Sequence, residues 1–131
     1  MTAPSLQDLS QALRDLHKTL LDAEFDNFPM ARSTADRLSL AVEHPSFAWL
    51  RALSELIVEF DELADAGEVT AAKLRQGRDA VERLLGPLPP SHAAFRGRYL
   101  EYLQLAPDVA IATGAVRQRL AGIARPAQAG G

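Results

Sequence analysis

The sequence contains no cysteine, and this absence removes several kinds of chemistry at once. Disulfides, thiolate nucleophiles, iron–sulfur clusters and cysteine-ligated zinc all need this residue. Long apolar runs are missing as well, since stretches such as 56–58 fall far short of the roughly 20 residues that span a bilayer. The first residues do not resemble a signal peptide, which has a charged and then an apolar segment. We therefore expect a soluble, cytoplasmic protein that does not bind membranes.

The chain has 131 residues, of which 47% are hydrophobic and 24% charged. Both fractions are typical of globular proteins, and the length fits a single hydrophobic core. We expect residues 1–124 to form one helical domain. Residues 125–131 lack apolar periodicity and contain Pro126, Gly130 and Gly131, so they are predicted to be a flexible C-terminal tail.

Apolar residues recur at spacings of three and four, which is typical of helices that bury one face. Neither a strand-like alternation nor an internal repeat occurs. The predicted fold is all-α: a compact bundle of four main helices, a short helix, and a C-terminal helix that Pro107 either kinks or splits. The predicted N-caps are Ser5, Ser33 and Ser91, and a further helix is predicted to start at Thr70.

The segment from Pro45 to Ala66 is the most apolar part of the chain, and its apolar residues fill a helical arc of about 140°. Such a wide face predicts contacts with two neighbours, and hence the central helix of the bundle. In the preceding short helix, a stripe of three apolar residues is expected to be buried: Leu38, Ala41 and Val42. Three acids lie opposite the apolar arc of 45–66 and are predicted to be solvated: Glu55, Glu59 and Glu62.

No catalytic, metal or cofactor site is predicted. Helical bundles that bind paired metals use Glu-x-x-His motifs, and this sequence has none. His17 is expected at the edge of a buried stripe, whereas His44 and His92 are expected at helix starts. Ser46 and Ser54 lack a Gly-x-Ser-x-Gly context, and no histidine is expected beside either.

Nucleic-acid binding is disfavoured by the formal net charge of −3. The best basic candidates for such binding are Arg75, Arg78, Arg96 and Arg98. The net charge conceals a strong asymmetry: residues 1–70 carry 13 acids and 5 bases, whereas residues 71–131 carry 4 acids and 9 bases. Opposite charges of this kind favour contact between the two halves, within one chain or between copies.

Four apolar residues are left over once the predicted core stripes are assigned: Phe47, Val58, Leu100 and Ile111. The preferred hypothesis is a non-enzymatic helical interaction domain that self-associates through these residues, with a dimer as the expected oligomer. Another protein partner is also left open. The alternative hypothesis is a small-ligand or metal-dependent activity in an interhelical pocket near three aromatic residues that would otherwise be core: Trp49, Tyr99 and Tyr102.

Two stretches of the chain resemble a group of uncharacterised bacterial helical-bundle proteins. The first comprises 44–51, 53–54, 56–58 and 61–62, and the second comprises 98–101 and 107–109. The resemblance covers about a third of the chain. It implies a helical bundle and no particular function.

Overall fold

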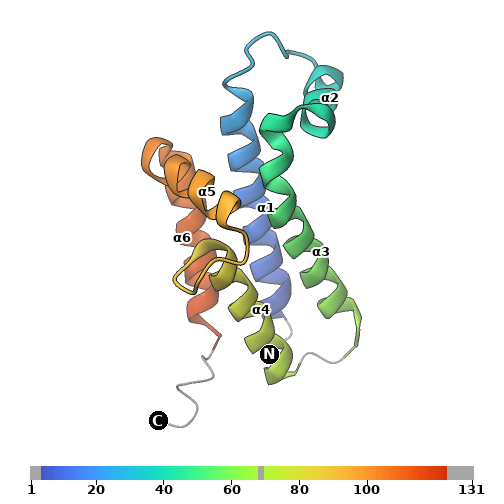
Figure 1. Ribbon diagram of the computed structural model, residues 1–131. Helices are drawn as coiled ribbons and strands as arrows, with labels where there is room; N and C mark the ends of the chain where they lie inside the picture. The colour runs from blue at the N-terminus through green and yellow to red at the C-terminus, as the bar shows by residue number, and fades with distance from the viewer. Residues whose placement is uncertain (1–3, 68–69, 124–131) are drawn as a thin grey trace.

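The computed structural model describes residues 4–67 and 70–123, which contain helices and no strand. The predicted all-α class is therefore confirmed (Figure 1). The elements are α1 (Pro4–Phe25), α2 (Thr34–Glu43), the 3₁₀ helix η1 (Pro45–Leu50), α3 (Arg51–Asp65), α4 (Ala71–Leu85), α5 (Ala93–Leu105) and α6 (Pro107–Ala121). The predicted tail 125–131 lies outside the described residues. Within them, no helix is long and apolar enough to cross a bilayer.

The central helix is α1, and the prediction that 45–66 would be central is wrong. Helix α1 packs mainly against α6 and α3, and it also contacts η1, α4 and α5. Its buried stripe explains this position, because five leucines at spacings of three and four are fully buried: Leu6, Leu9, Leu13, Leu16 and Leu20. Figure 1 shows α1 running through the bundle with α3 and α6 on different sides of it.

The predicted continuous helix over 45–66 is divided into η1 and α3. In a 3₁₀ helix, residues three apart lie on the same face, so Phe47 and Leu50 both point into the core. The His44 ring caps this turn, since its Nδ1 accepts a hydrogen bond from the backbone N–H of Ser46 at 3.1 Å. His44 therefore occupies the helix-start position predicted for it.

The predicted N-cap Ser33 and the predicted helix start at Thr70 are confirmed, and both residues cap their helices. Ser33 accepts a hydrogen bond from the N–H of Asp36, and Thr70 accepts one from the N–H of Lys73. The other two starts differ, because α1 already begins at Pro4, and the N-cap of α5 is His92 rather than Ser91. The N–H of Ser91 instead donates to the carbonyl of Arg83 at 2.8 Å, which ties the turn back to α4.

Pro107 starts a separate helix, which resolves the choice between a kink and a split. Ala106 is extended (φ −116°, ψ 108°), as a residue before proline prefers to be, and α6 begins with Pro107 in its first turn. The stripe predicted for this helix is confirmed as buried: Val109, Ala112, Val116, Leu120 and Ile123.

Helix α2 contradicts the prediction of a buried stripe. Leu38 and Val42 are 64% and 71% exposed, and the helix contains no buried residue. Its Leu40 and Ala41 are only partly buried against the core. In Figure 1, α2 stands at one end of the bundle beside the end of α1, so the body of the helix is not enclosed by the other helices.

Candidate functional site

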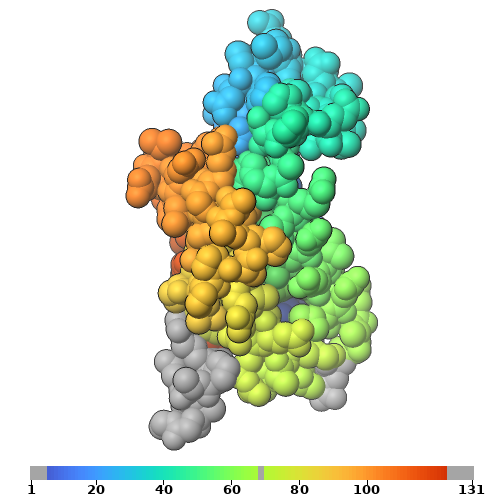
Figure 2. All heavy atoms as spheres, viewed as in Figure 1, coloured from blue at the N-terminus to red at the C-terminus, as the bar shows by residue number. Residues whose placement is uncertain are grey.

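A groove runs along α3 on the side of α4 and the start of α5. Three adjoining hollows of about 210, 200 and 320 Å³ form it. The first two share Ala52, Glu55 and His92, and the last two share Glu59 and Ala80, so neighbouring hollows adjoin one another along α3. Figure 2 shows the depression between α3 and α4, with atoms of α1 visible at its bottom.

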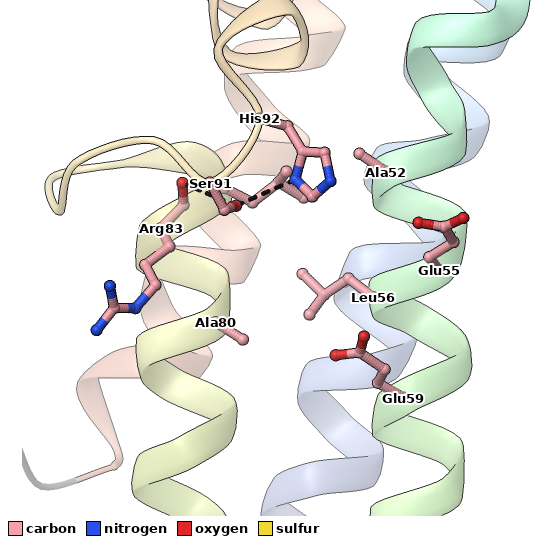
Figure 3. A pocket seen from close by; sticks show the side chains of 9 residues that line it. Ala52, Glu55, Leu56, Glu59, Ala80, Arg83, Ser91 and His92 are labelled. Carbon is pink, nitrogen blue, oxygen red and sulfur yellow. Dashed lines mark hydrogen bonds between the residues drawn. The ribbon is translucent and has the colours of Figure 1, made fainter.

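The middle of the groove has an apolar floor and polar rims (Figure 3). Leu56 of α3 and Ala80 of α4 point toward one another across the gap. On the α3 rim the carboxylate of Glu59 leans toward the opening, whereas on the α4 rim the side chain of Arg83 extends away from α3. The His92 ring closes the upper end and lies 3.2 Å from the hydroxyl of Ser91. The groove therefore offers an apolar surface between an acidic and a basic edge.

The three acids of the α3 rim are Glu55, Glu59 and Glu62, and all are exposed, as predicted. Gly77 keeps the lower groove open on the α4 side, because a Cβ atom there would lie 3.1 Å from the ring of Phe60. Ala66 and Ala80 also line this part. Small residues on both helices thus leave room for side chains of another helix.

The three aromatic residues predicted near an interhelical pocket lie in one packed cluster with Phe95. Trp49 stacks on Tyr102 with ring centroids 5.9 Å apart, and its other neighbour, Phe95, lies at 5.3 Å. Phe95 in turn stacks on Tyr99 at 5.9 Å. The rings therefore occupy the space between η1 and α5, although Trp49 and Phe95 also line the upper hollow of the groove. Burial raises the pKa of the Tyr99 phenol, whose hydroxyl pairs with that of Thr113 at 2.9 Å.

Glu24 is a buried carboxylate that sequence analysis missed. It is 1% exposed and accepts hydrogen bonds from Trp49 Nε1 at 3.1 Å, Asn27 at 3.1 Å and Arg98 at 3.2 Å. Burial, followed by the charge of Glu24 and a hydrogen bond to it, raises the pKa of the Tyr102 phenol. The sequence contained a signal for the burial of Glu24, because this residue follows the buried Leu20 by four positions and so lies on the same face of α1.

His17 and Ser54 form a hydrogen-bonded pair, and the prediction that no histidine lies beside this serine is wrong. His17 Nε2 lies 2.9 Å from Ser54 Oγ. Burial lowers the pKa of His17, which favours the neutral ring. The two residues are 37 positions apart, and only the antiparallel packing of α1 on α3 brings them together. A motif search along the chain cannot find such a pair.

The four predicted interface residues do not form one surface. Phe47 is 4% exposed and packs against the rings of Phe25 and Phe28, so it belongs to the core rather than to an interface. The other three are exposed: Val58 at 54%, Leu100 at 44% and Ile111 at 73%. They lie on α3, α5 and α6 respectively, and α3 and α6 flank α1 from different sides.

Three of the four arginines considered for nucleic-acid binding make internal bonds. Arg78 is buried and donates to the carbonyls of Leu120 and Ile123. Arg96 donates to backbone carbonyls of α4 and of the turn after it, and Arg98 binds Glu24. Among the described residues, no group of three or more histidine and acidic side chains is arranged to hold a metal ion.

No protein-family model, no curated protein and no solved structure matches this chain. The resemblance to bacterial helical-bundle proteins therefore stays a prediction.

Proposed function

We propose that this protein is a non-enzymatic interaction domain that forms a dimer through the groove between α3 and α4. The observation that carries the proposal is the opposite charge of the two helices beside the groove. Helix α3 contains five acids and one base, whereas α4 contains four bases and two acids. A surface with one acidic and one basic half is complementary to a second copy of itself.

The symmetry of such a dimer follows from this arrangement. A twofold axis parallel to the groove places α3 of each copy over α4 of the other. Glu55 and Glu59 then face the partner's basic helix, and Arg75 and Arg83 face the partner's acidic helix. The small and apolar residues of the two grooves then face one another across the axis, between the charged rims.

The size of the face indicates the class of interface that it could form. At 1.5–2.0 Å per residue, η1 and α3 together are about 30 Å long, and two helices side by side are about 20 Å wide. Each copy therefore buries about 600 Å², or about 1,200 Å² in total, which is the lower end for stable specific interfaces. We expect a dissociation constant of micromolar order.

Charge reversal with mixing tests the proposal. One variant carries Glu55→Lys and Glu59→Lys on α3, and the other carries Arg75→Glu and Arg83→Glu on α4. Sedimentation velocity from low to several hundred micromolar should give a dimer for the natural protein and a monomer for each variant alone. An equimolar mixture of the two variants should dimerise again, because each reversed helix then faces its opposite charge.

The control for the α3 variant carries Asp8→Lys and Asp26→Lys, which change the net charge equally at exposed acids outside the groove. It should dimerise like the natural protein, and circular dichroism should show the same helix content in all variants. A natural protein that stays monomeric, reversed variants that still dimerise, or a mixture that stays monomeric would each overturn the proposal.

A further inference from the structure

A second cavity lies beneath α2 and shares Ala48 and Arg51 with the upper hollow of the groove. Its volume is about 440 Å³, and residues of α1, α2, η1 and α3 line it. Most of its wall is apolar, with contributions from Leu21, Ala41, Val42, Phe47 and Leu50. The volume is within the usual range of about 300–1,000 Å³ for sites that enclose small organic molecules.

The hydrogen-bonded pair of His17 and Ser54 lines this cavity. The Ser54 hydroxyl also lies 3.4 Å from the carbonyl of Leu50 in the preceding turn. A hydroxyl has one donor and two acceptor positions, and a neutral imidazole has one of each. The pair therefore retains hydrogen-bonding capacity for a ligand after its two atoms have bound each other.

The charged groups around the cavity balance one another. Arg51 and Glu43 both line it and are both exposed, so one cation and one anion stand at its edge. His44 also lines it, with Nδ1 engaged by the N–H of Ser46. Along the α1–α3 contact beyond Ser54, Arg14 and Asp61 form an ion pair. An ionic ligand would lose its hydration here without meeting a net opposite charge, which is unfavourable.

We infer that this cavity binds a small uncharged molecule that has an apolar body and one hydroxyl head, such as an alkylphenol, and that the His17–Ser54 pair binds the head. The apolar body replaces water along the walls formed by α2, η1 and α1. With the pair intact, the ligand hydroxyl donates to a remaining acceptor position of Ser54 Oγ, because the second ring nitrogen of His17 points to the other side of the imidazole.

Four probes of one shape test the class of ligand: para-propylphenol, propylbenzene, para-propylbenzoate and para-propylbenzylamine. Titration of the isotope-labelled full chain by NMR gives the affinity and the residues whose amides shift. We expect para-propylphenol to bind at the residues lining the cavity, and to bind about tenfold more tightly than either charged probe. Its hydroxyl should give it a fivefold to tenfold advantage over propylbenzene, since one hydrogen bond contributes about 1 kcal/mol.

Two pairs of variants locate the site. Ala41→Leu fills the cavity and should abolish binding, whereas Ala35→Leu places the same side chain at an exposed position of the same helix and should leave binding unchanged. Ser54→Ala should remove the advantage of the phenol over propylbenzene. Thr19→Ala, which removes a hydroxyl of α1 that bonds to Asp15 in its own helix, should keep that advantage.

The inference is overturned if para-propylphenol shifts no cavity residue, or if a charged probe binds more tightly. It is equally overturned if Ala41→Leu binds the phenol as well as Ala35→Leu does, or if Ser54→Ala leaves the phenol's advantage intact. Circular dichroism of each variant establishes that it is folded before the titration is read.

Discussion

At the scale of single residues, Glu24 is a buried carboxylate held by three hydrogen-bond donors. It joins three elements, because its partners Trp49 and Arg98 belong to η1 and α5 while Glu24 itself belongs to α1. An isolated buried carboxylate is costly, and each of these donors offsets part of that cost. The cluster therefore fixes how α5 and η1 sit on the central helix.

Glu24→Ala should lower the free energy of unfolding by about 2 to 3 kcal/mol, because it leaves the indole N–H of Trp49 without its acceptor and removes the buried partner of Arg98. Urea denaturation followed by tryptophan fluorescence measures this loss, since Trp49 is the only tryptophan. Glu101 provides the control, because it also pairs with Arg98 but is 65% exposed. Glu101→Ala should cost less than about 0.5 kcal/mol, and equal losses in the two variants would contradict the role assigned to Glu24.

His17 makes stability depend on pH. Burial lowers its pKa below the ordinary value of 6.5, so the unfolded chain takes up a proton before the folded chain does. The stabilisation that neutral His17 contributes is fully present above pH 6.5. It declines as the pH falls from 6.5 through the lowered pKa of His17 in the folded protein. Chemical denaturation between pH 7.5 and pH 5 should show this decline, and His17→Gln should reduce it because Gln does not titrate.

A control variant is needed for this test, because two further ionisable side chains, His44 and Glu43, line the same cavity as His17. His92→Gln removes an exposed histidine elsewhere and should leave the decline unchanged. A His17→Gln variant with the full decline of the natural protein would show that another group is responsible.

At the scale of elements, the distance between α3 and α4 depends on a glycine. Gly77 of α4 faces the ring of Phe60 on α3, and Phe60 is almost fully buried. A methyl group at this position would need the ring to move, and the packed core resists such movement. The same residue thus sets the helix spacing and keeps the lower groove open.

Gly77→Ala and Gly114→Ala form a matched pair, because both glycines lie inside helices. A Cβ atom at Gly114 meets nothing within 4 Å, so alanine there should raise the free energy of unfolding by about 0.5 to 1 kcal/mol through helix propensity. At Gly77 the same gain is outweighed by overpacking, which typically costs about 1 to 3 kcal/mol, and a net loss of about 1 kcal/mol is expected. Urea denaturation measures the free energy of unfolding of both variants. Equal stabilisation by the two substitutions would show that the Phe60 ring can move without a cost in stability.

The elements also show what periodicity can predict. Sequence patterns found the helices, the cap at Ser33, the helix start at Thr70 and the buried stripe of α6, because these depend on local geometry and on one buried face. Periodicity failed for α2, because no neighbouring element covers the predicted stripe that begins at Leu38. The width of an apolar face also misidentified the central helix, since α1 achieves complete burial with a narrower row of leucines.

At the scale of the whole molecule, the acidic first half and the basic second half form few ion pairs with each other among the described residues. Among the ion pairs formed between described residues, Arg98 with Glu24 joins the halves, whereas pairs such as Arg14 with Asp61 lie within one half. Much of the acidic surface of α3 therefore stays exposed. The sequence predicts this asymmetry, but which charges face each other depends on packing that no local pattern contains.

The candidate sites also contain some features that the sequence could predict and others that it could not. The acids of the groove could be placed on the exposed face of 51–65 from spacing alone. The groove itself, the cavity beneath α2 and the His17–Ser54 pair could not, because each is formed by side chains from helices far apart in the chain. Such sites require the mutual position of helices, which single-helix periodicity does not specify.

Arginine–carbonyl bonds connect the second half of this cysteine-free chain. Arg78 binds the carbonyls at the end of α6, Arg96 binds those at the end of α4, and Arg117 binds the carbonyl of Gly86 at 2.8 Å. A guanidinium keeps its proton throughout the range in which proteins are folded, and a peptide carbonyl does not titrate. These non-covalent contacts therefore hold α4, α5 and α6 together in a way that is indifferent to reductants, oxidants and moderate acid or alkali.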